Sequence, residues 1–153
     1  MALSPAQQLE GFLRKFDPAV AKVVRAARTN LRRRFPTATE LVYDNYNFLV
    51  IGYCSTPRAS DCVASLAAAA NGVGLSFYYG ASLPDPRGIL LGAGKQNRFV
   101  RLPSARTLEE PAVAALLTAA ARQAKTPLPV SGRGRLVISS ISAKQRPRKR
   151  SPR

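Results

Sequence analysis

Residues 62–79 read CVASLAAAANGVGLSFYY, and they decide the fold because they predict a β-hairpin in the middle of the chain. The dipeptide Asn71-Gly72 tolerates the positive φ angles of a type I′ turn, which joins strands in the tightest hairpins. Beyond the turn, apolar residues alternate with small or polar ones, as in a strand with one buried face: Val73, Leu75, Phe77 and Tyr79. The alanines at 67–70 favour helix on propensity alone. The alternation outweighs this preference, and we predict strands on both sides of the turn.

The residues before this hairpin predict two helices and a second hairpin. Ser4-Pro5 and Asp17-Pro18 each combine a capping residue with a proline at the first helical position. Apolar residues follow both at helical spacing, and Pro36 ends the second helix because it lacks the amide that a continuing helix would need. Residues 41–43 and 48–54 are rich in β-branched and aromatic residues and are separated by turn-forming residues, so we predict two paired strands there.

The residues after the hairpin predict a loop, a short strand and a last helix. Residues 81–97 contain glycines and prolines at intervals and indicate a long irregular connection. A short strand is expected at 99–102. Ser104 or Thr107 could cap a helix that runs to about Ala124.

The chain as a whole is predicted to form one folded domain and a basic tail. Residues 1–125 are expected to form an α+β domain, with a curved antiparallel sheet of about five strands, two N-terminal helices and one C-terminal helix. Residues 126–153 begin with a proline-containing linker and end in a run of bases, so we expect a partly disordered tail. Within it, Leu136-Val137-Ile138 could dock as an edge strand.

Charge is the strongest indication of function. The chain has 24 lysines and arginines against 8 acids, a net charge of +16, and no acid follows Glu110. This balance favours nucleic acid or another polyanion, through counterion release and long-range steering. A solubilising disordered tail, or a genome rich in arginine codons, would produce the same excess of basic residues. The candidate contacts are the bases concentrated on the second helix and in the tail: Lys22, Arg25, Arg28, Arg32, Arg133, Arg135, Lys144, Arg146, Arg148, Lys149 and Arg150.

The residue types of common catalytic sites are missing or isolated. The chain has no histidine, which excludes Ser-His-Asp and Cys-His nucleophile systems and histidine metal sites. Gly92-Ala93-Gly94-Lys95 resembles part of a phosphate loop, but Ile89 stands where the first glycine of that motif belongs. Asp85 lies between prolines and is typical of a turn. We therefore do not predict an enzyme, a cofactor or a metal site, and we expect Cys54 and Cys62 to be small core residues.

The body of the chain also resembles a family of small bacterial domains. The matching residues are Glu40-x-x-Tyr43 with Tyr46 and Phe48, Phe77-x-x-Gly80-Ala81-x-Leu83-x-Asp85, Leu91-Gly92 with Gly94-Lys95, and Arg98 to Leu102. With the flanking helices they cover about residues 17–124, and they are similar to the YdhG-like family, whose function is not known. The resemblance implies an α+β fold and a pocket near the tyrosine turn and the glycine loop. The lining residues expected there are Tyr43, Asn45, Tyr46, Lys95, Arg98 and Arg101.

These observations lead to three hypotheses for the function. The leading one is a non-enzymatic domain that contacts nucleic-acid backbone or another polyanion with little sequence specificity. The second is a small-molecule binding or carrier module that uses the tyrosine-lined pocket. The third follows from the resemblance, because some members of the wider family are described as frataxin-like iron chaperones. The eight acids here are scattered, however, whereas a hard cation needs clustered oxygen ligands.

The sequence also indicates where the protein works. No run of about 18 apolar residues is present, which is the length that a membrane-spanning helix needs. The N-terminus lacks the charged, apolar and small-residue regions of a secretory signal. We therefore expect a cytoplasmic bacterial protein without a membrane span.

Overall fold

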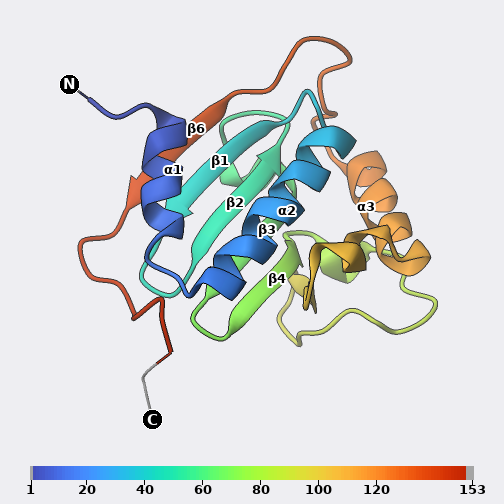
Figure 1. Ribbon diagram of the computed structural model, residues 1–153. Coiled ribbons are helices and arrows are strands. Elements are labelled where there is room, and N and C mark those ends of the chain that lie inside the picture. Colours follow the sequence, from blue (N-terminus) through green and yellow to red (C-terminus); the bar gives the residue numbers. More distant parts are fainter. Residues whose placement is uncertain (1, 151–153) are drawn as a thin grey trace.

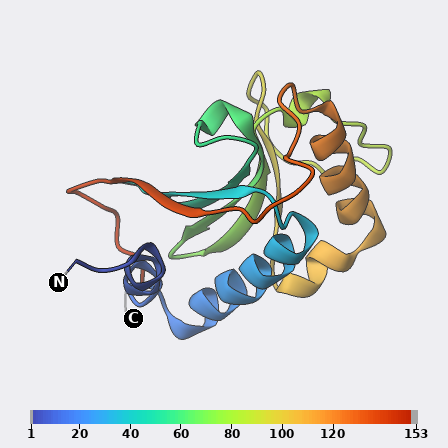
Figure 2. The same cartoon turned by 90° about the horizontal axis from the view of Figure 1, so that it is seen from above.

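Helices pack against one face of a mixed β-sheet (Figures 1 and 2). The computed structural model describes residues 2–150. Within these residues the strands form one sheet in the order β5-β4-β3-β2-β1-β6. The elements are α1 (Pro5–Leu13), α2 (Pro18–Arg34), β1 (Thr39–Asp44), β2 (Leu49–Cys54), η1 (Ala59–Asp61), β3 (Cys62–Ala69), β4 (Gly72–Phe77), η2 (Gly80–Ser82), β5 (Arg98–Arg101), η3 (Ala105–Glu109), α3 (Pro111–Gln123) and β6 (Leu136–Ile141). The predicted α+β class, with two N-terminal helices and one later helix, is confirmed.

The two N-terminal helices begin where their capping residues predict. The Ser4 hydroxyl accepts a hydrogen bond from the Gln7 backbone N–H, and the Gln7 side chain accepts one from the Ser4 N–H. This reciprocal pair satisfies two amides that the first turn of a helix leaves free. α2 begins at Pro18 and ends just before Phe35 and Pro36. Its apolar face lies on the sheet and buries Ala21, Val24, Ala27 and Leu31.

Both predicted hairpins are present, but the turn of the second differs from its prediction. β1 pairs with β2, and β3 pairs with β4, each antiparallel. Ala70 and Asn71 form the turn between the paired residues Ala69 and Gly72. Among the described residues, positive φ angles occur in glycines alone, so Asn71 does not have the φ of a type I′ turn and that prediction is wrong. The positive φ, 136°, falls on Gly72, where no Cβ is present to clash.

The sheet has one strand more than predicted, and it is not purely antiparallel. β6 pairs with β1 in parallel at the edge of the sheet, which confirms the edge strand predicted at 136–138. Parallel partners need a long connection, and here residues 45–135 separate the two strands. α3 and the loop that follows bring the chain to the edge where β6 lies (Figure 1). The loop before β6 lies close to the connection between α2 and β1, where Gly134 donates its N–H to the Pro36 carbonyl. This close approach requires glycine, because a Cβ at position 134 would overlap the carbonyl of Ala38. The predicted boundary at residue 125 therefore separates a strand from its own sheet.

The predicted loop and last helix are confirmed with shifted boundaries. Residues 81–97 are irregular apart from η2 and one isolated bridge. α3 begins at Pro111, because Ser104 caps the preceding 3₁₀ turn rather than the helix. Asp85 is confirmed as a turn residue, since its carboxylate accepts hydrogen bonds from the backbone N–H groups four and five positions later.

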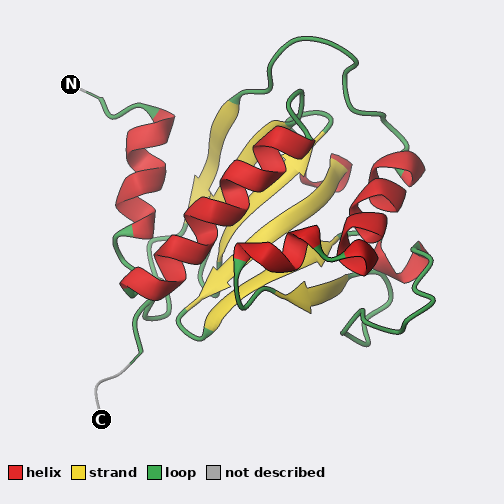
Figure 3. Cartoon of the chain, turned by 45° about the vertical axis from the view of Figure 1, so that its right-hand side comes forward, coloured by secondary structure: helices red, strands yellow, loops and turns green. Residues whose placement is uncertain are grey.

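Strand alternation divides the sheet into a buried face and an open face. Figure 3 shows the α-helices in red on the near side of the yellow sheet. The face beneath them supplies the core, with Tyr53, Leu66 and Phe77 each at 1% exposure or less. In β4 every second residue is buried, and the residues between them are half-buried on the opposite face. This opposite, open face is where a binding site can lie.

Candidate binding site on the open sheet face

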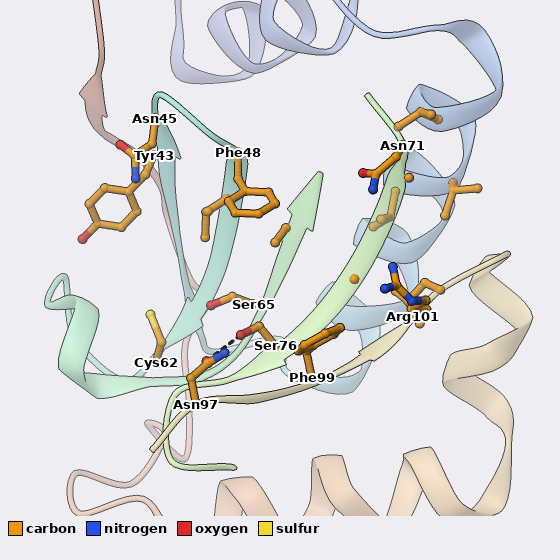
Figure 4. Close-up of a pocket in the computed structure, with 18 of the residues that line it drawn as sticks. Tyr43, Asn45, Phe48, Cys62, Ser65, Asn71, Ser76, Asn97, Phe99 and Arg101 are labelled. Atoms are coloured by element: carbon orange, nitrogen blue, oxygen red, sulfur yellow. Dashed lines mark hydrogen bonds between the residues drawn. The ribbon is translucent and has the colours of Figure 1, made fainter. Parts of the chain in front are cut away.

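A hollow of about 990 Å³ lies on the open face of the sheet (Figure 4). We call it the sheet groove. Its floor consists of small residues from two neighbouring strands: Ser65 and Ala67 on β3, and Gly74 and Ser76 on β4. Small side chains leave the space above the strands empty, so a flat molecule could lie directly on the sheet. Beyond the β3–β4 turn the groove reaches α2, which contributes Ala19, Val20 and Val23.

Aromatic side chains form the walls of the sheet groove. Tyr43 comes from β1, Phe48 from the residue before β2, Tyr78 from the residue after β4, and Phe99 from β5. Phe48 and Tyr78 are exposed, at 45% and 43%. Exposed aromatic side chains grouped on one face are typical of a binding surface, because a ring can stack on a planar ligand and bury a large area.

The polar groups of the sheet groove are neutral or positive. Among its lining residues in the described chain, Arg101 is charged and no carboxylate is present. The Arg101 guanidinium carbon lies 5.8 Å from the centroid of the Phe99 ring, a cation–π geometry that holds a positive charge at the groove wall. Asn45, Asn71 and Asn97 add amide groups, and Asn97 accepts a hydrogen bond from the Ser76 hydroxyl.

The structure brings together some of the predicted pocket residues and separates others. Tyr43, Asn45 and Arg101 line the sheet groove, whereas Tyr46, Lys95 and Arg98 do not. For Arg98, alternation along β5 explains the separation, because Phe99 and Arg101 point to the open face and Arg98 points away from it. Arg98 donates hydrogen bonds to the carbonyls of Gly94 and Asn97 instead. Tyr46 lies beneath the guanidinium of Arg146, at 5.6 Å.

Several lining residues were missed in the sequence. Phe48, Phe99 and Asn97 were not singled out as site residues, nor were the small floor residues. The signal for Phe99 was present, because its place next to Val100 puts the two on opposite faces of a strand. The small residues of the groove floor gave no comparable signal in the sequence. Small residues in a strand are a sign of weak side-chain packing and do not by themselves indicate a binding site.

The C-terminal residues 142–150, which we call the C-terminal strap, fold back onto the β1–β2 turn. Asp44, at 0% exposure, binds the Lys15 ammonium and the Arg148 guanidinium, with Arg148 Nη2 2.9 Å from its Oδ1. Backbone or side-chain groups of Ser142, Gln145 and Arg146 donate hydrogen bonds to the carbonyls of residues 44 and 46. This turn separates Tyr43 from Phe48, so the strap supports one wall of the groove.

Several predicted polyanion contacts are occupied within the protein. Arg148 is 4% exposed and forms an ion pair with Asp44. The prediction that Arg148 is a surface contact for polyanions is therefore wrong. Arg25 binds Glu10, while Arg28 and Arg32 bind Glu40. Some of the bases on α2 and in the tail thus pair with acids from other parts of the chain. The remaining candidates are exposed: Lys22, Arg133, Arg135, Lys144, Arg146, Lys149 and Arg150.

A buried acid anchors the inner side of α2. Glu40, at 5% exposure, accepts hydrogen bonds from Arg28 and from the Tyr53 hydroxyl at 2.9 Å. Burial is the main cause that raises the pKa of Tyr53 well above its usual value, and the Glu40 charge adds to it. The pair therefore acts as a fixed structural connection between α2 and the sheet.

The two cysteines are buried as predicted, but they form a disulfide between Cys54 and Cys62. The predicted role as separate small core residues is corrected. The bridge connects the end of β2 to the start of β3 beneath one end of the groove, where Gly52 is needed because a Cβ there would meet the Cys62 sulfur at 2.6 Å.

Other classes of site find little support in the described residues. Within residues 2–150, no three acidic or cysteine side chains gather where they could hold a metal ion. None of the helices in that part of the chain has the length and apolar character to cross a membrane. No protein-family model matches the chain, and searches of curated proteins and of solved structures found no significant match. The resemblance to the YdhG-like family therefore stays a prediction.

Proposed function

We propose that the protein binds a small planar molecule with a negative charge in the sheet groove. The observation that carries this proposal is the composition of one open sheet face: a floor of small residues, aromatic walls and Arg101 without a carboxylate. Groove volumes of several hundred Å³ with apolar walls and a few polar groups are typical of small-molecule sites. The function is thus the second of the three hypotheses from the sequence, with a different set of lining residues.

Each part of the groove supports one property of the ligand. The rings of Phe48 and Phe99 favour an aromatic body, since stacked aromatic pairs contribute about 0.5–1.5 kcal/mol beyond the area they bury. Arg101 favours a carboxylate, sulfonate or phosphate, because its planar guanidinium can donate two hydrogen bonds to such a group. The asparagine amides can donate and accept, and they would orient the polar edge of the ligand.

The compartment in which the protein works is a second part of the proposal. We propose a YdhG-like domain of the bacterial cytoplasm, as the sequence suggested. The Cys54–Cys62 bridge is an observation against a strongly reducing compartment, because cytosolic disulfides are rare. Alkylation of free thiols before cell lysis, followed by mass measurement, tests the proposed location. Two alkylated cysteines would agree with the cytoplasm, and a protein without alkylated cysteines would overturn the cytoplasmic assignment.

The groove is tested with a pair of fluorescent probes of similar shape and different charge. 8-Anilinonaphthalene-1-sulfonate combines a flat naphthalene ring with an anionic sulfonate, and N-phenyl-1-naphthylamine is its uncharged counterpart. We expect the sulfonate to bind more tightly. Phe99→Ala should weaken both probes about 2- to 13-fold, which corresponds to the 0.5–1.5 kcal/mol of one lost aromatic contact, and Arg101→Gln should remove the preference for the sulfonate. Lys95→Gln is the control, because Lys95 is an exposed cation outside the groove.

Equal losses in Arg101→Gln and Lys95→Gln would contradict the proposal, because they would mean that the sulfonate responds to the net charge of +16 and not to a site. Equal binding of both probes to the wild type would also contradict it. Thermal unfolding of each variant checks that a loss of fluorescence reflects the groove and not a loss of fold.

A further inference from the structure

Arginines from two distant parts of the chain meet at one end of the molecule. The loop between α3 and β6 crosses the connection between α2 and β1 (Figure 1). Two backbone hydrogen bonds attach it there: Gly134 N–H donates to the Pro36 carbonyl at 3.0 Å, and Glu40 N–H donates to the Arg135 carbonyl at 2.8 Å. Arg133 and Arg135 therefore lie beside the C-terminal end of α2, which carries Arg33 and Arg34.

These four residues, Arg33, Arg34, Arg133 and Arg135, form what we call the basic end. Arg33, Arg133 and Arg135 are exposed and Arg34 is half-buried. Within residues 2–150 none of the four belongs to an ion pair, although ion pairs hold other arginines of α2. The nearest acid along the chain, Glu40, is buried and already bound by Arg28 and Arg32. The positive charge of this end is thus not neutralised by the fold.

The segments around the basic end bring no negative side chain close to it. No acid occurs in the loop at 124–135 or in the α2–β1 connection at 35–39. Arginines at the C-terminal end of a helix are stabilised by the helix dipole, which accounts for Arg33 and Arg34. The dipole does not account for Arg133 and Arg135, which belong to a loop and are held at the same place by backbone hydrogen bonds.

We propose that the basic end binds the phosphodiester backbone of nucleic acid. Phosphates spaced along a strand match several guanidinium groups spread over one surface, and each contact releases counterions. This inference is independent of the sheet groove, which lies on the open face of the sheet. It also moves the polyanion contact predicted from the sequence away from the strap, where Arg148 is buried, and from the part of α2 whose charges are paired.

A membrane surface is the other large polyanion, and the basic end suits it less. Interfacial anchors combine bases with several exposed apolar residues on one amphipathic helix. Among the described residues, the exposed large apolar residue nearest in sequence to Arg133 and Arg135 is Val130, and it lies in a loop. Anionic vesicles therefore serve as an arm of the test.

The test uses the full chain and three variants that separate location from total charge. The basic-end variant carries Arg33→Gln, Arg34→Gln, Arg133→Gln and Arg135→Gln. The matched control carries Arg14→Gln, Arg87→Gln, Lys95→Gln and Arg106→Gln, four exposed bases elsewhere, so both variants fall from +16 to +12. A strap variant carries Lys144→Gln, Lys149→Gln and Arg150→Gln. Fluorescence anisotropy measures binding of labelled single-stranded RNA, single-stranded DNA and duplex DNA at several salt concentrations.

We expect the basic-end variant to bind at least tenfold more weakly at about 0.1 M salt, with the slope of log K against log salt reduced by about 3 for single strands, about 0.7 for each lost phosphate contact. The control and the strap variant should keep most of the affinity. Equal losses in the basic-end variant and the control would overturn the proposal in favour of net charge. A loss confined to the strap variant, no binding by the wild type, or tighter binding to phosphatidylserine vesicles than to nucleic acid would also overturn it. If Arg34→Gln lowers the thermal stability, the three exposed substitutions alone repeat the test.

Discussion

Replacing Asp44 by asparagine should destabilise the protein strongly, because two cations depend on this one carboxylate. Asp44 is 0% exposed and binds Lys15 and Arg148. Asparagine has nearly the same shape, so the change removes the negative charge and leaves the packing. Removing one partner of a buried ion pair costs about 3–5 kcal/mol, since the other charge stays buried without compensation. The Lys15 side chain is 40% exposed and can turn to water, so we place the loss of unfolding free energy near the lower limit, at about 3 kcal/mol.

The surroundings of Arg148 sharpen this prediction. Its side chain is 2% exposed, and Nε and Nη1 have no hydrogen-bond partner among the described residues. Once Asp44 is neutral, the buried guanidinium is a net cost, because unsatisfied buried donors cost about 1–3 kcal/mol each. Adding Arg148→Met to Asp44→Asn should therefore recover at least about 1 kcal/mol of stability. A methionine can still fill the space against the Phe16 ring, which the Arg148 guanidinium carbon approaches to 5.7 Å.

Urea unfolding followed by circular dichroism measures these differences, provided that the slope against urea is unchanged. Glu10→Gln is the control, because the Glu10–Arg25 pair is exposed on both sides and should be worth about 0.2–1 kcal/mol. The reasoning would be refuted if Asp44→Asn cost no more than Glu10→Gln. It would also be refuted if the double variant were less stable than Asp44→Asn alone, because Arg148 would then not depend on Asp44.

The loss of stability in Asp44→Asn should depend on pH. Burial by itself would raise the pKa of Asp44, but the hydrogen bonds that its carboxylate accepts from Lys15 and Arg148 outweigh it, and the pKa in the folded protein is lowered. A carboxyl with a lowered folded pKa stabilises the fold above its unfolded pKa, about 3.9. That contribution is lost as the pH falls through the folded value. The difference between wild type and Asp44→Asn should therefore be full at neutral pH and decrease below about pH 4.

Three further predictions concern the sheet. Gly134→Ala should cost about 1–3 kcal/mol in urea unfolding, because its Cβ would overlap the Ala38 carbonyl; no loss would mean that the loop does not lie on the α2–β1 connection. Tyr53→Phe should cost about 1.5–3 kcal/mol, the value of a hydrogen bond to a charged group, since the hydroxyl donates to Glu40; a neutral result would contradict that bond. A chain that ends at Lys125 should unfold at lower temperature than one that ends at Ile141, because the shorter chain lacks β6; equal midpoints would make β6 dispensable.

Local signals in the sequence predicted the helices and hairpins well, because each depends on residues that are close in the chain. Ser4-Pro5 marks the start of α1 through hydrogen bonds within one turn. Asp17-Pro18 marks the start of α2, although the Asp17 side chain makes no capping hydrogen bond there. The alternation after Gly72 predicted β4 for the same reason. The turn type failed at Asn71, since its φ is decided by how β3 and β4 are paired and not by what asparagine tolerates.

The candidate sites depended on residues that are far apart in the chain, and there the sequence was a weaker guide. Tyr43, Asn45 and Arg101 were predicted together and do line one groove. Lys95 and Arg98, close to Arg101 in sequence, do not, because strand alternation and the loop before β5 direct them elsewhere. The basic residues of the tail and α2 could be counted from the sequence. The sequence did not show which of them form ion pairs with Glu10, Glu40 and Asp44.

By itself the sequence determined the fold class, the helix starts, the β-hairpins and a positive charge that no arrangement of eight acids can neutralise. Only the tertiary structure decided that β6 pairs in parallel with β1 and that Arg148 is buried against Asp44. The physical reason is the range of the interactions. Capping, turns and alternation act within a few residues, whereas strand pairing at a sheet edge and the compensation of a buried charge join positions about a hundred residues apart, with no local pattern to announce the partner.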